Sequence, residues 1–147
     1  MTVCFFGHRS IIEKEVEPGL NCVLLQLINE GECEFLVGHQ GQFDLLVIKT
    51  LEQMQLSFPQ LNFYIVLSYM PGPKKQYQTL DYSRAFFPEG LESAPARFAI
   101  PRRNRWMIDN SNIVVTYCTH HGGAHDAMLM ARHKGKRVIN LSEQKWA

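Results

Sequence analysis

The sequence predicts one three-layer α/β domain over residues 1–147, with a mainly parallel sheet of five or more strands. Short apolar runs alternate with stretches whose apolar residues recur at helical spacing. The length is typical of a single domain with a sizeable core. Connections that contain helices join strands in parallel through right-handed crossovers. Together these observations predict a Rossmann-like arrangement.

Five strands and four helices are expected from these patterns. The strands are predicted at 3–6, 35–37, 62–67, 113–117 and 138–141, and the helices at 11–30, 43–58, 102–110 and 125–133. Pro18 indicates a kink or a fresh start within the first helix. Repeated prolines and glycines break any period over 69–100, so this stretch is expected to be a mobile lid over the ligand edge or to hide a misread strand.

The composition limits the classes of partner. The formal net charge is only +1, which argues against DNA and against a membrane surface. No apolar stretch approaches the roughly 20 residues that a membrane helix needs. The first residues lack the basic region of a signal peptide, so a cytoplasmic location is expected. The four cysteines show no CxxC spacing and are expected to be reduced and structural.

Glycines, arginines and histidines gather on the turns that follow predicted strands. These turns meet at the carboxyl edge of a parallel sheet, where ligands bind. Glycine allows close backbone approach, helix starts attract anions, and arginine binds phosphate through two N–H groups. The sequence therefore predicts a site for a phosphate-bearing ligand. Its expected binding residues are Gly7, His8, Arg9, Gly38, Gly41, Asp44, Arg103, Asn104, Gly122 and Gly123.

Several of these residues have two interpretations. A glycine after a strand is often only a tight turn, and Asp44 either stabilises a helix start or accepts hydrogen bonds from ribose. Arg103 is expected to be exposed and to contact phosphate, whereas Arg102 and Arg105 are expected to be solvated surface charges. Trp106 and Met107 fit the core better than a base-stacking role.

The histidine cluster near residue 120 raises the question of a metal. His121 and His125 are four residues apart, a spacing that zinc ligands use on helices, and His120 and Asp126 lie beside them. However, Gly122 and Gly123 separate the histidines, so the helix is expected to begin after His121. We therefore expect no metal and no other cofactor, with the histidines donating hydrogen bonds to a ligand or to water.

Four segments together resemble the YpsA-like proteins of the SLOG superfamily, which also contains DprA and the LOG enzymes. The segments are Phe6-Gly-His-Arg9, Val37-Gly-His-Gln-Gly-Gln-Phe-Asp44, Ile100-Pro-Arg-Arg-Asn-Arg-Trp-Met107 and Gly122-Gly123. The resemblance covers nearly the whole chain. It implies a Rossmann-like fold and binding of a nucleotide or a nucleotide-derived small molecule. Superfamily relatives are often dimers, so a homodimer is also implied.

The resemblance also raises an enzymatic alternative. LOG enzymes cleave the N-glycosidic bond of nucleoside monophosphates, and their Arg-Lys-x-x-Met motif is similar to the segment from Arg103 to Met107. Their Pro-Gly-Gly-x-Gly-Thr-x-x-Glu loop is matched only at Gly122 and Gly123, and Leu129 stands in place of its glutamate. Leucine cannot transfer a proton. Binding without turnover is therefore the leading expectation. A rearranged hydrolase would need Asp126, Glu89 or a histidine, and Arg103, as catalytic groups.

Overall fold

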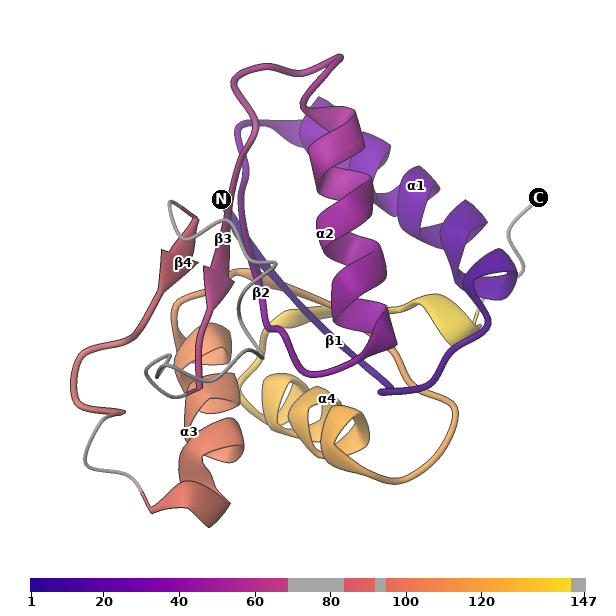
Figure 1. The fold of residues 1–147 in the computed structure, drawn as a ribbon. Helices are drawn as coiled ribbons and strands as arrows, with labels where there is room; N and C mark the ends of the chain where they lie inside the picture. The colour runs from indigo at the N-terminus through magenta and orange to yellow at the C-terminus, as the bar shows by residue number, and fades with distance from the viewer. Residues whose placement is uncertain (69–83, 92–94, 144–147) are drawn as a thin grey trace.

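The chain folds as a parallel sheet between two layers of helices (Figure 1). The computed structural model describes residues 1–68, 84–91 and 95–143. Its strands are β1 (Thr2–Gly7), β2 (Glu34–Val37), β3 (Asn62–Val66), β4 (Ala85–Phe86), β5 (Ile113–Tyr117) and β6 (Arg137–Asn140). Its helices are α1 (Glu13–Glu30), α2 (Gln42–Met54), α3 (Ala96–Asp109) and α4 (Gly123–His133), followed by the short 3-10 helix η3 (Leu141–Glu143).

The six strands lie in the order β4-β3-β2-β1-β5-β6, and every neighbouring pair is parallel. The predicted α/β class with a Rossmann-like sheet is thereby confirmed. From β1 to β4 the chain adds strands on one side of β1, and from β5 it adds them on the other side. The order therefore reverses between β1 and β5, and such a reversal opens a crevice at the carboxyl ends of those strands.

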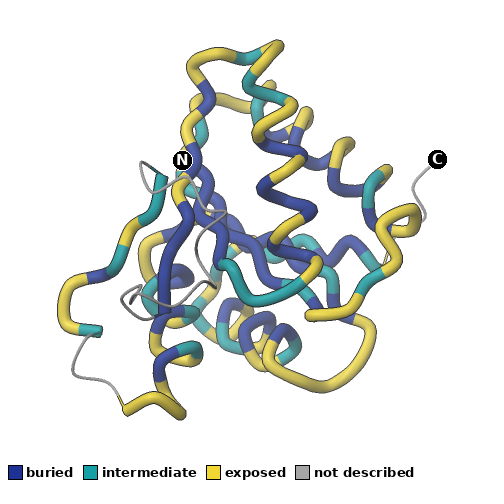
Figure 2. Tube along the Cα trace, viewed as in Figure 1, coloured by how far each residue is buried: buried dark blue, intermediate teal, exposed yellow. Residues whose placement is uncertain are grey.

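The central strands are apolar throughout because both faces of the sheet are covered. In β1, Val3 and Phe5 pack with α1 and α2, whereas Cys4 and Phe6 pack on the opposite face with α3 and α4. Figure 1 shows these two helix pairs on opposite sides of the strands, and Figure 2 shows buried residues concentrated between them. The two cores fix which ends of the helices meet at the crevice.

The cysteines are reduced, and burial decides the protonation of the thiol in β1. All four are free thiols, and Cys4 lies fully buried in β1. Burial raises the pKa of the Cys4 thiol to about 12, so this thiol stays protonated. Cys118 follows β5 and is also buried, and its Sγ donates to the His120 carbonyl oxygen.

Element boundaries differ from the prediction where local signals compete with packing. α3 begins at Ala96 rather than at 102, so Pro101 is inside the helix, and α1 likewise contains Pro18. Each proline is the sixth residue of its helix, where the loss of one N–H donor affects only the carbonyl oxygen one turn earlier. α2 ends at Met54, four residues before the predicted end, and continues as turns.

The stretch at 69–100 contains one strand that the periodicity did not reveal. β4 comprises only two residues and pairs with the end of β3. The misread-strand alternative is therefore right for residues 85–86, and α3 occupies the end of the stretch from residue 96. The expected lid falls mostly on residues 69–83 and 92–94, which lie outside the described part of the chain.

Across the described ranges, no helix combines the length and the apolar character needed to cross a bilayer.

Gly7 sets how closely α2 approaches β1. A methyl group at Gly7 would lie 2.1 Å from a ring carbon of Phe43, which is fully buried. We expect Gly7→Ala to lower the free energy of unfolding by about 1–3 kcal/mol through overpacking. Urea denaturation measures this change. Gly123→Ala is the control, because nothing lies within 4 Å of its added methyl group. Equal stabilities of Gly7→Ala and wild type would contradict this account.

Candidate functional site

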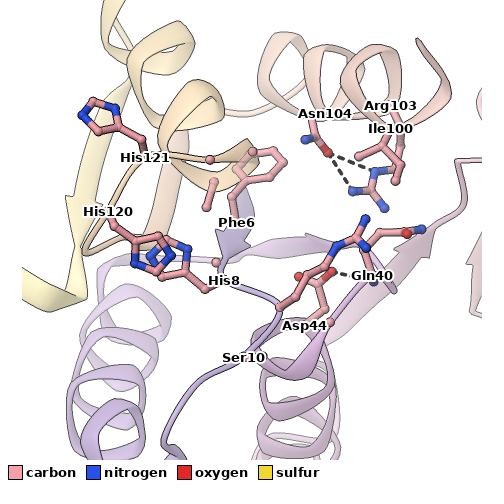
Figure 3. Close-up of a pocket in the computed structure, with 16 residues that line it drawn as sticks. Phe6, His8, Ser10, Gln40, Asp44, Ile100, Arg103, Asn104, His120 and His121 are labelled. Carbon is pink, nitrogen blue, oxygen red and sulfur yellow. Dashed lines mark hydrogen bonds between the residues drawn. The ribbon is translucent and has the colours of Figure 1, made fainter. Parts of the chain in front are cut away.

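A cavity of about 430 Å³ lies at the carboxyl edge, where the strand order reverses (Figure 3). All of the predicted binding residues except Gly38 line it. The lining consists of Phe6, Gly7, His8, Arg9, Ser10, Gln40, Gly41, Asp44, Ile100, Arg103, Asn104, His120, His121, Gly122, Gly123 and Ala124. The turns after β1, β2 and β5 thus meet in one site, as the sequence predicts.

The turn after β1 contributes a histidine that is locked to the turn after β5. His8 is almost fully buried, and its Nε2 accepts a hydrogen bond from the backbone N–H of Thr119 at 2.8 Å. Its ring stacks on His120 with centroids 3.8 Å apart and an interplanar angle of 10° (Figure 3). Burial first, and then the charge of His120, lower the pKa of His8. Neutral His8 therefore holds the two turns together, because protonation of Nε2 would remove its acceptor.

The turn after β2 contributes two glycines that make room for neighbouring arginines of the protein itself. A methyl group at Gly38 would lie 2.4 Å from Nη1 of Arg103, and one at Gly41 would lie 2.5 Å from the Cα of Arg9. Gly38 does not line the cavity; it leaves room for the guanidinium behind it. Both glycines therefore act through packing against the arginines.

Asp44 is a buried carboxyl group on the cavity wall. It is the third residue of α2, and its Oδ2 accepts a hydrogen bond from the backbone N–H of Gln40 at 2.9 Å (Figure 3). Burial raises the pKa of Asp44, while the charge of Arg103 and the Gln40 N–H oppose that rise. Asp44 stabilises the turn before α2 and also faces the cavity, so both interpretations of this residue stay open.

Arg103 is buried, so the expectation of an exposed arginine is wrong. It is only 3% exposed, and its Nε and Nη2 donate to Oδ1 of Asn104 at 3.1 and 2.7 Å. It lies beside Gly38 and contributes its positive charge to Asp44. The helical face that buries Met107 also buries Arg103. The guanidinium is therefore part of the cavity wall and also part of the fold.

The start of α4 is the least obstructed backbone in the site. Gly122 precedes the helix with a φ of 151°, a conformation that favours glycine, and no side chain of the described residues caps the helix start. Among the residues that the structure describes, no atom lies within 4 Å of a methyl group added at Gly122 or at Gly123. These two residues line the cavity, so the unpaired N–H groups of the first turn are accessible to a ligand.

The loop before α4 is held by residues that sequence reasoning missed. Asn140 accepts a hydrogen bond from the Cys118 N–H through Oδ1 and donates to the Cys118 carbonyl oxygen through Nδ2, both at 3.1 Å. Ser142 Oγ donates to the same carbonyl oxygen at 2.7 Å. Both residues come from the end of β6 and from η3. Asn140 lies inside the strand predicted at 138–141, and no sequence pattern signalled this support.

The carboxylates of the enzymatic alternative lie outside the cavity. Asp126 is exposed in the first turn of α4, Glu89 is exposed in the turn after β4, and neither lines the cavity. Leu129 is 47% exposed and also lies outside. Among the described residues, Asp44 is the sole carboxylate in the lining. Neither Asp126 nor Glu89, nor the residue at position 129, therefore places a proton-transfer group in the cavity.

The histidines near residue 120 interact with one another. His121 and His125 form an edge-on ring pair with centroids 4.4 Å apart. Within the described ranges, no group of three or more histidine, cysteine, aspartate or glutamate side chains is arranged to bind a metal. His120 and His121 both line the cavity, where their rings can donate hydrogen bonds.

The fold and the cavity together define a class: a doubly wound parallel α/β domain with a cavity at the strand-order reversal. Two solved structures of DprA share this fold. The X-ray structure of DNA processing protein A from Streptococcus pneumoniae has a TM-score of 0.66 and 18% identity, covering 93% of this chain and 48% of that chain. DNA processing protein A from Helicobacter pylori, described for its unique single-stranded DNA binding mode, has a TM-score of 0.64 and 12% identity, covering 94% of this chain and 63% of that chain.

These comparisons show that the chain shares its fold with the two DprA proteins. The chain spans less than two thirds of the length of either DprA chain, and the identities of 18% and 12% show the shared fold alone. No protein-family model matches the chain, and no curated protein matches its sequence. The YpsA-like subtype stays a prediction.

Arg103 and Arg9 differ in how much the fold depends on them. We expect Arg103→Ala to lower the free energy of unfolding by about 2–4 kcal/mol, because it removes buried charged hydrogen bonds and leaves a void beside Gly38. Arg9 is exposed, so Arg9→Ala should change that free energy by less than about 0.5 kcal/mol. Urea denaturation of both variants tests the difference. Equal stabilities would mean that the Arg103 guanidinium is not structural.

Asp44 should make stability depend on pH. Because its pKa is raised above the ordinary value of 3.8, its contribution to stability is fully present below about pH 4 and is lost as the pH rises through the folded-state pKa. Asp44→Asn keeps an acceptor for the Gln40 N–H but cannot ionise. We therefore expect the variant to gain stability relative to wild type as the pH rises from 4 to 7. Urea denaturation at four pH values measures the gain, and parallel profiles would contradict it.

Proposed function

We propose that the cavity binds a nucleotide, with its phosphate at the start of α4 and its ribose near Asp44. One observation carries the proposal: the unobstructed Gly122–Gly123 backbone begins α4 inside a cavity that Arg9 also lines. A helix start and an arginine attract the same anion by different means, the first through aligned N–H groups and the second through its charge.

The dimensions of the cavity suit such a ligand. Its volume of about 430 Å³ falls within the usual range for small-molecule sites, roughly 300–1,000 Å³. A phosphate at the helix start would leave the rest of the ligand to lie against Phe6, Ile100 and Asp44. The Asp44 carboxyl group can accept a hydrogen bond from a ribose hydroxyl when ionised, or donate one when protonated. The lining thus offers polar groups for phosphate and sugar, with apolar surface for the remainder.

Single-stranded DNA is a second candidate, in which the bound nucleotide belongs to a strand. The observation that favours it is the shared fold with the Helicobacter pylori protein, whose structure concerns single-stranded DNA binding. The net charge of +1 argues against DNA only as an average over the whole chain. Binding depends on the local arrangement of cations, so the average is a poor guide here.

The carboxylates proposed for a LOG-like hydrolase receive no support from the arrangement of the side chains, although Arg103 and the histidines His120 and His121 do line the cavity. Cleavage of an N-glycosidic bond needs a group that stabilises positive charge on the sugar and usually one that assists the leaving base. Asp126 and Glu89 lie outside the lining, and Asp44 is already bound to the Gln40 N–H. Binding without turnover is therefore the proposed activity.

The decisive experiment places a negative charge at the phosphate position. We expect nucleoside monophosphates to raise the melting temperature of the wild-type protein, and the matching nucleosides to have little effect, because a bound ligand stabilises in proportion to its affinity. Gly123→Asp should weaken monophosphate binding at least tenfold through charge repulsion. Calorimetric titration with AMP, GMP, CMP and TMP gives the dissociation constants.

Asn21→Asp is the matched control. It adds the same charge on the exposed side of α1, away from the cavity. Gly123→Ala tests size without charge. The proposal fails when none of the monophosphates binds the wild type, or when Gly123→Asp and Asn21→Asp bind equally well.

A further inference from the structure

α3 has an outer face that the cavity does not use. The helix directs Ile100, Arg103 and Asn104 toward the cavity. Phe98, Arg102 and Arg105, spaced at i, i+4 and i+7, form one stripe on the other side. All three are exposed, and Phe98 retains 42% of its surface. Among the described residues, Phe98 belongs to neither apolar core cluster.

Two further aromatic rings continue this face toward the sheet edge. Phe86 of β4 is 42% exposed and lies against Trp106 of α3, with ring centroids 5.2 Å apart. At the other end, the Arg97 guanidinium lies over the Phe98 ring at 4.8 Å. Within the described ranges, Phe86 and Phe98 are the two phenylalanines classed as exposed, and both belong to this surface.

The charge of this surface is positive. Three of the four arginines of α3 are exposed, namely Arg97, Arg102 and Arg105, and the helix has a single acidic residue, Asp109. Asp109 forms an ion pair with Lys134, the residue directly after α4, so it does not neutralise the exposed arginines of α3. Arg97 is seven residues before Asn104, which places it on the side of α3 next to the cavity. The positive surface is therefore continuous with the rim of the nucleotide site.

We propose that this outer face, formed by Phe86, Phe98, Arg102, Arg105 and Trp106, acts together with Arg97 on the cavity side of α3 to bind a single-stranded nucleic acid whose terminal nucleotide occupies the cavity. The proposal rests on the proposed nucleotide site for that terminal unit. Exposed rings stack on unpaired bases while arginines contact the intervening phosphates, a combination typical of single-strand binding. A duplex hides its bases from such rings.

The length of the surface agrees with this ligand. Phe98 and Arg105 are seven residues apart, which spans about 10 Å along a helix. That distance matches about three stacked nucleotides at roughly 3.4 Å each. A strand leaving the cavity past Arg97 would therefore place two or three nucleotides over α3.

The test compares a strand with a single nucleotide on the same variants. Fluorescence anisotropy follows labelled oligo(dT) of twelve nucleotides, and calorimetry follows TMP. We expect Arg102→Gln/Arg105→Gln to weaken oligo(dT) binding at least tenfold and to reduce the slope of log affinity against log salt by up to about 1.4, since each lost phosphate contact removes about 0.7. Phe98→Ala should weaken it about fivefold or more. TMP affinity should change less than twofold in both variants.

Lys49→Gln/Arg137→Gln is the charge-matched control, with one substitution on the exposed side of α2 and one at the start of β6. Oligo(rU) of the same length separates an RNA ligand from a DNA ligand, and tight binding of either supports the proposal. Wild-type protein that binds neither strand more tightly than TMP overturns the proposal and leaves the nucleotide site intact. Equal weakening in the control overturns it as well. Strand binding that depends on α3 but survives Gly123→Asp would support this surface and refute the nucleotide site.

Discussion

The buried guanidinium of Arg103 is the constraint on which the site depends. A charge that is 3% exposed needs polar partners, and it finds them in Asn104 on its own helix and in the charge of Asp44 on α2. These partners lie on different layers of the domain. Gly38 must lack a side chain so that the guanidinium can lie between them. The position of α3 relative to the turn after β2, and with it one wall of the cavity, is therefore determined by this arginine.

The burial of Arg103 also determines which residues of α3 border the cavity and which are exposed on its other side. With Arg103 turned inward, Asn104 and Ile100 border the cavity, and Arg102 and Arg105 on either side point away from it. One short run of sequence thus supplies a buried cation, a cavity wall and an exposed positive surface. The near-neutral net charge hides this separation, since it counts the arginines of one helix together with acidic residues elsewhere.

The fold could be predicted because its signals are local and agree with one another. Apolar runs such as that of β5 and the periodicity of α2 indicate their elements directly. β4 was not predicted from the sequence, because a strand of two residues shows no periodicity. Its position depends on its pairing with β3. The start of α3 at Ala96 was not predicted, because Pro101 indicates a helix boundary in the local sequence. Packing of the helix overrides that signal. The predicted turns do meet in one cavity, but the burial of Arg103 depends on which helical face meets the sheet, and sequence spacing alone left that open.

The glycines of the site illustrate what such patterns leave undecided. Gly7 and Gly41 are surrounded by Phe43 and Arg9, so their missing side chains serve the packing of the protein itself. Gly122 and Gly123 have no neighbour at the Cβ position within the described part of the chain, so packing there does not account for the absence of a side chain at Gly123. In sequence the two classes look alike, since each follows a strand. Their surroundings separate them, which is why the proposed phosphate position is the start of α4 rather than the turns after β1 and β2.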